Sequence, residues 1–415
     1  MSAYLRVLRH QDFRYLFMGQ AASVIGDRAV VVAIALYVTQ STGSATDLGL
    51  VLGGQTLPFV ALLLFGGVWA DRLPRHRIMI AADLTRAALH ALLATLILIG
   101  SVKIWQLVAI EACFGAAQAF FQPAYSGLLP QTVPEPLIQD ARALTESMAN
   151  LAFLLGPALA TVLVLGVGAG ETFAFDAATF VLSAAALARV RPRPRGESQP
   201  PAPVLTELRE GWAEVRSRPW VWATIAAFTG SVLSVFAFWY SLAPGLSRGL
   251  YGSVGVFGVL EILAGAGAVA GSLVSVRWRP AHPLRTGIAL IFSWPLLNAA
   301  FALHAPLAIV IAFALANGFG FSLFMVWWET ALAQHIPAHA LSRVSAYDWM
   351  GSLALLPLGY FVAGPLAEAL GARTVLGAGS AFGLLLLVLA LLPRSTRELR
   401  REPAQRVRLG LQADG

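Results

Sequence analysis

Gly67-Val-Trp-Ala-Asp71-Arg72-Leu-Pro-Arg75-His-Arg77 is a compact charged stretch between two long apolar runs of the sequence. It places one acid and three arginines beside hydrophobic segments of membrane length, and arginine-rich ends of membrane spans mark the cytoplasmic side. The Gly-x-x-x-Asp-Arg spacing predicts a tight helix contact through Gly67 and a carboxylate held beside its own counter-charges. The stretch therefore predicts a cytoplasmic connection between two membrane helices.

The composition of the chain is that of a membrane protein. Its 415 residues are 57% hydrophobic and only 12% charged, with a mean hydropathy of +0.70, whereas soluble globular proteins carry about 25% charged residues. The single cysteine, Cys113, excludes a disulfide framework and most thiolate metal sites. Because the histidines show no metal-ligand spacing, we expect no metal site.

Windows of about 20 mainly apolar residues predict helices that cross the bilayer. Twelve such windows follow one another, at 15–39, 46–70, 78–100, 104–128, 142–166, 173–190, 220–246, 252–276, 284–303, 306–332, 345–370 and 373–393. An even number of spans places both termini on one side of the membrane. We therefore expect an all-α integral membrane protein with twelve transmembrane helices.

The basic residues are distributed by side of the membrane. Of the 29 Lys and Arg, 24 fall at the two termini and in every second connection, while Lys103, Arg248 and Arg373 fall in the alternate connections and Arg28 and Arg86 inside spans. The positive-inside rule then makes both termini cytoplasmic. The bias for arginine over lysine is typical of a GC-rich bacterial genome, so we expect a bacterial inner membrane protein. The net charge of +7 reflects this topology, and we expect no nucleic-acid partner.

A polar, proline-rich stretch divides the chain. We expect a six-helix bundle over residues 1–190, a cytoplasmic linker over 191–218, a second bundle over 219–393 and a cytoplasmic tail over 394–415. Proline-rich sequence cannot continue a helix. Residues 204–216, in contrast, alternate apolar and charged positions at helical spacing and predict a short interfacial helix.

The two halves are related in sequence. Gln131-Thr-Val-Pro134 recurs as Gln334-His-Ile-Pro337, and Gly67 corresponds to Gly271 at nearly the same offset. The second copy of the charged stretch has Arg277-Trp-Arg279 but lacks the acid. Parallel six-helix repeats around a central axis are a transporter architecture, so we expect two pseudo-symmetric bundles. Gly267-x-x-x-Gly271 predicts close helix packing.

Residues 67–77 resemble the signature loop between helices 2 and 3 of the major facilitator superfamily, with Pro74 where that family usually has glycine. Other segments resemble its exporter branch of macrolide, multidrug and siderophore efflux proteins, to which lysophospholipid transporters are neighbours. These segments are Phe13-Arg-Tyr-Leu-Phe-Met-Gly-Gln20, Ser23-Val-Ile-Gly-Asp27, Leu128-Leu-Pro-Gln-Thr-Val-Pro134, Gly156-Pro157 and Phe175-Asp-Ala-Ala-Thr-Phe180. The resemblance covers nearly the whole chain. It implies the major facilitator fold and alternating access by rocking of two bundles, usually as proton-coupled export.

Polar residues inside membrane helices are candidates for function because each is costly in lipid. Helical spacing groups them into stripes on the first, fourth, seventh and tenth spans, which line the central cavity in the superfamily. The resemblance therefore implies a substrate cavity lined by Gln20, Ser23, Gln118, Gln122, Ser234, Phe238, Asn317, Phe321, Phe324 and Trp328.

Three acids are candidates for proton or cation coupling: Asp27 and Glu111 in two of these stripes, and Glu261 near the middle of the eighth span. A carboxylate in a partly dehydrated cavity can bind a proton reversibly. The alternative is a carboxylate in a structural helix–helix contact. Glu111 also departs from the family pattern, because proton-coupled relatives often carry an arginine four residues before the glycine that is Gly115 here.

The charged stretch itself is expected to be a cytoplasmic gate formed by Gly67, Asp71, Arg72, Arg75 and Arg77. Asp71 can meet the positive end of a helix dipole from the other half, while the arginines meet acids or lipid phosphates. Such contacts form only when the cytoplasmic side is closed. The alternative is a basic loop that only sets the topology.

The predicted function is export of a small amphipathic compound by alternating access coupled to proton entry. The compound is expected to be drug-like or antibiotic-like, with cations among the candidates. Acidic residues among apolar and aromatic walls suit such a molecule. A lysophospholipid transporter and a siderophore transporter stay open as alternatives. We expect a monomer that contacts membrane lipids, needs no cofactor beyond the proton gradient and is not an enzyme, because no nucleophile–base–acid set is present.

Overall fold

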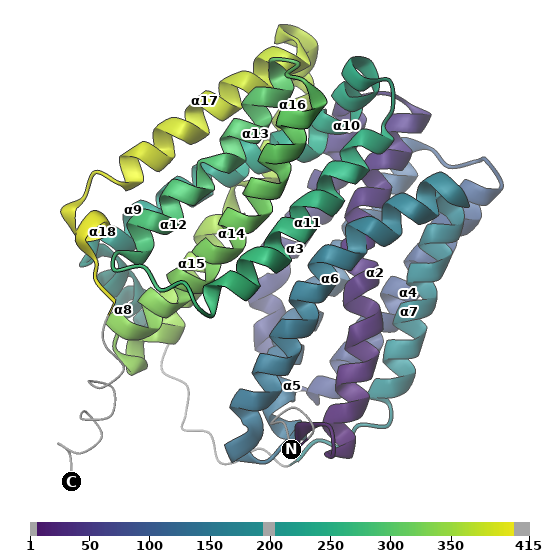
Figure 1. Cartoon of the computed structure of the whole chain (residues 1–415). Coiled ribbons are helices and arrows are strands. Elements are labelled where there is room, and N and C mark those ends of the chain that lie inside the picture. Colours follow the sequence, from purple (N-terminus) through teal and green to yellow (C-terminus); the bar gives the residue numbers. More distant parts are fainter. Residues whose placement is uncertain (1–5, 194–203, 402–415) are drawn as a thin grey trace.

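A computed structural model describes residues 6–193 and 204–401 of the chain. Residues 194–203 of the expected linker and residues 402–415 of the expected tail lie outside the described residues. Throughout the described part, the regular elements are helices (Figure 1). The protein is therefore an all-α integral membrane protein, as the composition predicts.

The first half of the chain forms six long helices. They are α2 (Gln11–Ser41), α3 (Ala45–Arg72), α4 (Arg75–Leu98), α5 (Ile104–Thr132), α6 (Ile138–Gly166) and α7 (Ala169–Leu187), with a 3-10 turn η1 (Glu135–Leu137) before α6. Residues that favour helix ends separate them. Gly43 has φ +67° after α2, and the Ser44 hydroxyl oxygen accepts a hydrogen bond from the Asp47 amide at 3.1 Å, which caps α3.

The second half repeats this arrangement with more interruptions. Its elements are α8 (Val204–Arg216), α9 (Pro219–Ser231), η2 (Val232–Phe236), α10 (Ala237–Tyr251), α11 (Gly255–Ser275), α12 (Pro283–Ile291), α13 (Ser293–Ala302), α14 (Leu307–His335), α15 (Ala338–Ala354), α16 (Leu356–Leu370), α17 (Ala372–Ala390) and α18 (Arg394–Glu398). The helix that the sequence predicts over 204–216 is present as α8.

The interruptions lie where the sequence disfavours a continuous helix. A break at Leu355 separates α15 from α16 just before Pro357, because proline disfavours continuation of a helix. A π-helical turn, η2, joins α9 to α10 within one span, and such turns often mark functional positions in helices. In contrast, α6 continues as one helix through Pro157.

Ten helical segments in the described part are long and apolar enough to cross a membrane. The other two expected spans, α6 and α7, are helices of 29 and 19 residues that carry ionisable residues, among them Asp140 in α6 and Glu171 and Asp176 in α7. Both still pack against α2 in the same bundle. They are therefore parts of the membrane domain, and Asp176 of α7 is buried among its helices.

Glycines bring two helix pairs into backbone contact at equivalent places in the two halves. In the first half, α3 packs on α5, with Gly66 against the Ala119 carbonyl and Gly115 against the Gln55 carbonyl. In the second half, α11 packs on α14, with Gly318 against the Ala264 carbonyl. A side chain at any of these glycines would overlap the facing carbonyl. Gly267 and Gly271 make the same kind of approach to α14, which confirms the close packing predicted for them.

The tight contact predicted through Gly67 is wrong for this structure. A side chain at Gly67 would meet no atom within 4 Å, whereas its neighbour Gly66 lies against α5. Successive residues of a helix point about 100° apart, so the sequence spacing identified the right turn of α3 but the wrong face. Gly67 is instead open toward the space beside α3.

The two halves meet at one end of the molecule. We call the end at which α3 leads into α4 the basic end, because Arg72, Arg75 and Arg77 lie there, and the opposite end the closed end. At the closed end α3 packs on α16 and α6 on α11. The Thr46 hydroxyl donates a hydrogen bond to Glu368 Oε1 at 2.5 Å across the two halves.

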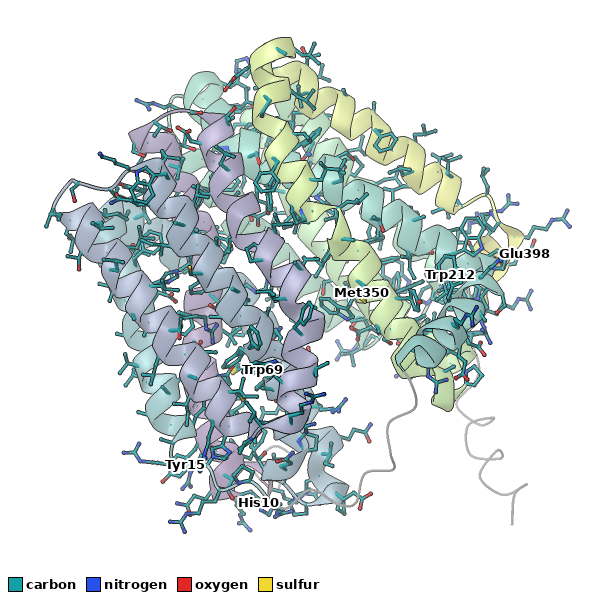
Figure 2. All side chains as sticks on the ribbon, turned by 180° about the vertical axis from the view of Figure 1, so that it is seen from behind. His10, Tyr15, Trp69, Trp212, Met350 and Glu398 are labelled. Atoms are coloured by element: carbon teal, nitrogen blue, oxygen red, sulfur yellow. The ribbon has the colours of Figure 1, made fainter. Side chains whose placement is uncertain are left out.

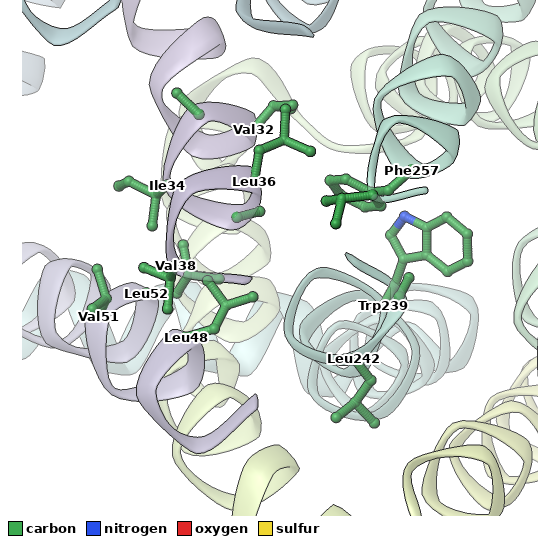
Figure 3. Packing of buried hydrophobic residues seen from close by; sticks show 14 of the residues in the cluster. Val32, Ile34, Leu36, Val38, Leu48, Val51, Leu52, Trp239, Leu242 and Phe257 are labelled. Carbon is green, nitrogen blue, oxygen red and sulfur yellow. The ribbon is translucent and has the colours of Figure 1, made fainter. Parts of the chain in front are cut away.

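A single apolar cluster fills this closed end. Figure 3 shows Leu48 and Leu52 of α3 on one side and Trp239, Leu242 and Phe257 of α10 and α11 on the other. Toward the basic end the two halves diverge (Figure 1). Figure 2 shows Trp69 and Met350 on the two sides of this separation, and their side chains are exposed. The structure is thus closed at one end and open at the basic end.

Candidate functional site

Asp27 of α2 and Arg86 of α4 form an ion pair between two helices. Arg86 Nη1 lies 3.4 Å from Asp27 Oδ2, and Arg86 Nη2 donates a hydrogen bond to Asp83 Oδ1, one turn earlier on α4. The Asp27 side chain is 23% exposed, whereas those of Arg86 and Asp83 are buried. The pair therefore joins a buried cation to an acid whose side chain is partly exposed.

Aromatic rings hold Arg86 in place. Its guanidinium carbon lies 4.2 Å from the centroid of the Phe180 ring and 4.4 Å from that of Phe121. Attraction between a cation and the face of a ring is stronger where water is excluded. Because a guanidinium stays charged in proteins, Arg86 is a fixed positive charge inside the first bundle.

One turn further along α4, His90 lies between two carboxylates. Its Nδ1 is 2.6 Å from Asp176 Oδ2 on α7, and its Nε2 is 3.4 Å from Glu111 Oε1 on α5. The His90 ring stacks on Phe114 with ring centroids 4.2 Å apart, and all three charged or polar side chains are buried. An imidazole placed in this way can carry a proton on either ring nitrogen.

We call Asp27, Asp83, Arg86, His90, Glu111 and Asp176 the acid cluster. Several of its polar atoms make no hydrogen bond within the described part of the chain: Asp27 Oδ1, Asp83 Oδ2, Arg86 Nε, His90 Nε2, Asp176 Oδ1 and both Glu111 carboxylate oxygens. Unpaired buried polar atoms are unfavourable, and protons on the acids or internal water would satisfy them. The described residues contain no group of His, Cys, Asp and Glu arranged to hold a metal ion.

Glu261, the third predicted coupling residue, lies in a different environment. The Trp239 indole donates a hydrogen bond to Glu261 Oε1 at 2.7 Å, and the Tyr240 hydroxyl donates one to Glu261 Oε2 at 2.6 Å. Both donors belong to α10, so the contact fixes α11 to α10. Glu261 is therefore separate from the acid cluster and satisfied by neutral partners.

The predicted polar stripe on α2 points mainly into the first bundle. Gln20 Nε2 donates a hydrogen bond to the Ser183 hydroxyl oxygen of α7 at 3.1 Å, and Ser23 is buried as well. On α5, Gln118 is partly buried and Gln122 is exposed. Among the members of these two stripes, Gln122 is exposed, and Asp27 and Gln118 are partly buried.

The predicted cavity residues of the second half are largely packed in its core. Phe324 stacks on Phe228 of α9 with centroids 4.8 Å apart, and Trp328 packs on Trp220 while its indole donates to Asp348 Oδ2 at 2.8 Å. The remaining members divide into the buried Ser234 and Phe238 and the partly buried Asn317 and Phe321. In this conformation Phe324 and Trp328 face α9 and not the space between the halves.

Of the predicted gate residues, Arg75 is bound within the first half. Arg75 Nε donates to the Ala70 carbonyl at 3.2 Å and its Nη1 to the Gly127 carbonyl at 2.5 Å, so it braces α3 against α5. Arg72 and Arg77 are exposed. The side chain of Asp71 lies outside the described residues. The open basic end agrees with a gate whose contacts form in another state.

Four members of the acid cluster were missed by the sequence reasoning as site residues. Asp83, Arg86 and His90 recur at three- and four-residue spacing within an apolar span, which is the periodicity of a single helix face. This signal is as strong as the stripes on the first and fourth spans. Asp176, the fourth, gives no such pattern in the sequence, because its partner His90 comes from another helix.

Comparison with known proteins places this geometry in a family. The model of the Major Facilitator Superfamily matches residues 16–354. Macrolide efflux protein A of Streptococcus pyogenes is 30% identical over 154 residues, which cover 36% of this chain and 37% of that protein. The multidrug efflux pump Tap of Mycolicibacterium fortuitum is 27% identical over 388 residues, 90% of this chain and 93% of the relative. The match to the macrolide protein thus spans little more than a third of its length.

Solved structures resemble the chain over nearly its whole length. A bacterial homolog of the human lysosomal transporter Spinster, in an inward-facing and unoccupied conformation, matches with a TM-score of 0.71 at 17% identity. The match covers 97% of this chain and 99% of that one. At this level of identity, the likeness establishes the fold.

Proposed function

The chain belongs to the Major Facilitator Superfamily, and from this premise we propose that it exports a small amphipathic compound in exchange for protons. The efflux proteins among its relatives support export as the direction. The observation that carries the coupling is the Asp27–Arg86 pair. It holds an acid with 23% of its side chain exposed at the edge of a buried group of acids.

The coupling would use Asp27 as the site of proton exchange. With its proton bound, Asp27 is neutral and its attraction to Arg86 is weakened; without it, Asp27 and Arg86 form a full ion pair between α2 and α4. A change of this kind alters the packing of two helices of the first bundle, and so can favour one arrangement of the halves. Glu261 would take part only indirectly, through α10 and α11.

Export also requires a side assignment, which the distribution of basic residues supports. The arginine-rich connections lie at the basic end, and the positive-inside rule puts that end in the cytoplasm with both termini. The described conformation would then be inward-facing and ready to take up cargo. We propose two six-helix domains, residues 1–190 and 219–393, that rock as a monomer around the closed end.

The cargo is proposed to be hydrophobic and to include cations. Asp27 is the acid of this cluster whose side chain is partly exposed, so it is the carboxylate that a cation beside α2 would meet. The exposed side chains of Trp69 and Met350 lie on the two sides of the opening between the halves (Figure 2). The putative bacilysin exporter BacE of Bacillus subtilis, which is 26% identical over 270 residues, supports an antibiotic-like cargo.

Drug-susceptibility profiling of bacterial cells that express the protein tests this function. Cells with the wild-type chain should tolerate one or more amphipathic antibiotics better than cells with Asp27→Asn, at equal membrane levels of both proteins. A protonophore should remove the difference. Equal susceptibility across a broad panel would contradict drug export, and resistance that survives collapse of the gradient would contradict proton coupling.

A further inference from the structure

The acid cluster contains more acids than one exchangeable proton explains. Four carboxylates face one guanidinium, so neutrality requires three protons shared among Asp27, Asp83, His90, Glu111 and Asp176. Buried charges without partners are strongly unfavourable. The cluster therefore keeps protons on members that solvent does not reach, in addition to any proton on Asp27.

We propose that His90 is a proton relay between Asp176 and Glu111, and that the first bundle thereby holds a second exchangeable proton beside the one on Asp27. This inference rests on the proposed function in one respect, the use of these protons to drive export. Proton storage and relay are themselves properties of the bundle. They can be measured without cargo or a gradient.

The geometry at His90 is that of a relay. Each ring nitrogen faces a carboxylate oxygen, Nδ1 at 2.6 Å from Asp176 and Nε2 at 3.4 Å from Glu111. When Glu111 gives its proton to Nε2, the proton on Nδ1 passes to Asp176, and the reverse steps return it. One O–H bond is replaced by another on the opposite side of the ring, and the total charge of the three residues does not change.

Glu111 is the inner end of this path. Its side chain is fully buried, and neither carboxylate oxygen makes a hydrogen bond within the described residues. An ionised carboxylate in that position would lack the donors that a buried charge needs, whereas a carboxylic acid can donate its proton toward His90. Glu111 is therefore the natural store of the second proton.

Asp176 is the end that communicates with the exchange site. Its Oδ1 lies against Gly26 of α2, so that a side chain at Gly26 would overlap it, and the next residue of α2 is Asp27. The charged groups around His90 thus come from each packed helix in turn: Asp27 from α2, Asp83 and Arg86 from α4, Glu111 from α5 and Asp176 from α7. Only Asp27 among the cluster members has an appreciably exposed side chain.

Aromatic rings isolate the relay from solvent. His90 stacks on Phe114 and makes edge contacts with Phe173 and Phe180 at ring-centroid distances of 5.4 and 6.1 Å. This lining leaves protons on Glu111 without a direct path to water. Their exchange must then pass through His90, which gives the relay a kinetic signature.

Infrared difference spectroscopy of the purified full chain in lipid nanodiscs tests the proposal, because protonated carboxyl groups absorb separately from carboxylates. We expect Glu111→Gln to remove one carboxyl band that the wild type shows. We expect His90→Phe to keep that band but to slow its hydrogen–deuterium exchange by an order of magnitude. Glu171→Gln, at an exposed acid in the first turn of α7, is the matched control and should leave band and exchange rate unchanged.

A second variant, His90→Gln, separates relay from packing. Glutamine can hydrogen-bond to both acids but cannot pass a proton through a ring, so it should slow exchange as His90→Phe does while thermal unfolding stays close to that of the wild type. Wild-type exchange in both His90 variants, or an unchanged band in Glu111→Gln, would overturn the relay. Proton-dependent export that persists alongside such a result would leave the proposed function standing, and a working relay with gradient-independent export would contradict only the coupling.

Discussion

Arg86 organises the interior of the first half. It is nearly fully buried between Phe121 and Phe180, and it contacts Asp83 on its own helix and Asp27 on α2. A charged group in this position is maintained only by its partners. Asp27 of a neighbouring helix and Asp83 of α4 therefore lie against it. The same contacts form the site and help to hold α4 in the bundle.

Removal of this charge should destabilise the protein more than removal of a surface arginine. Arg86→Met leaves Asp83 and Asp27 without their cation, and loss of one partner from a buried ion pair costs about 3–5 kcal/mol. The expected result is a markedly lower thermal unfolding temperature of Arg86→Met in detergent. Arg77→Met, at an exposed position, is the control and should unfold at the wild-type temperature.

The double variant Arg86→Met with Asp83→Leu checks the cause. It removes the buried acid that lost its partner, so it should recover part of the lost stability. Equal stability of Arg86→Met and the wild type would contradict a structural role for the pair.

At the scale of helices, single residues determine where a helix is interrupted and where two helix backbones come into contact. The π-helical turn η2 is one case: the buried Asn298 of α13 donates a hydrogen bond to the Val235 carbonyl at 2.9 Å. The bond satisfies a carbonyl within the irregular part of the span, where helix geometry is locally changed. It also ties α13 to the seventh span.

Asn298→Leu should therefore destabilise the second half. A buried acceptor left without its donor costs about 1–3 kcal/mol, which thermal unfolding of the purified protein would register. Asn317→Leu, on α14 at a partly buried position, is the comparison variant and should have a smaller effect. A larger loss of stability in Asn317→Leu than in Asn298→Leu would contradict this account of η2.

Two adjacent glycines on α3 should respond differently to the same substitution. Gly66→Leu places a side chain against the Ala119 carbonyl and should disrupt the packing of α3 on α5, whereas Gly67→Leu meets open space. We expect Gly66→Leu to lower the amount of folded protein. Gly67→Leu should fold normally but lose transport, if the basic end closes over this face of α3.

Spin-label distances across the basic end would show this difference. The Gly67→Leu variant should stay open under conditions in which the wild type closes. Normal transport by Gly67→Leu, or normal folding of Gly66→Leu, would be inconsistent with the assignment of the two faces.

Hydropathy and periodicity predicted the elements well because both depend on local sequence. The spans and the helix over 204–216 both follow from sequence windows within a single helix. The direction in which a polar or aromatic stripe points cannot be predicted from such windows. Phe324 and Trp328 form the stripe that their spacing predicts, yet they pack on α9. Similarly, Asp27 and Glu111 were identified singly, but their connection through Arg86 and His90 depends on contacts between four helices.

At the scale of the whole molecule, the halves form one structure at the closed end and separate at the basic end. There α3 packs on α16, α6 packs on α11, and α10 packs on α2 and α3. The hydrogen bond between Thr46 and Glu368 joins α3 to α16 across the halves. The acid cluster lies entirely within the first half. Proton binding would thus act on one bundle, and the other would respond through the shared apolar cluster at the closed end.

Asp71→Ala tests the gate at this scale. The substitution removes the acid expected to meet a helix end of the second half when the basic end closes, so transport should fall while membrane insertion stays normal. Transport rates in cells, normalised to the protein in the membrane, measure the effect. Unchanged transport would count against a gate in this stretch.

The most direct test of proton-coupled export is transport into inverted membrane vesicles with an imposed pH gradient. The probe is the compound that shows the largest difference in susceptibility between cells with the wild type and cells with Asp27→Asn. We predict uptake by wild-type vesicles only while the gradient is present, no gradient-driven uptake by Asp27→Asn, and wild-type behaviour of Glu171→Gln. Equal uptake with and without the gradient, or full uptake by Asp27→Asn, would contradict the account.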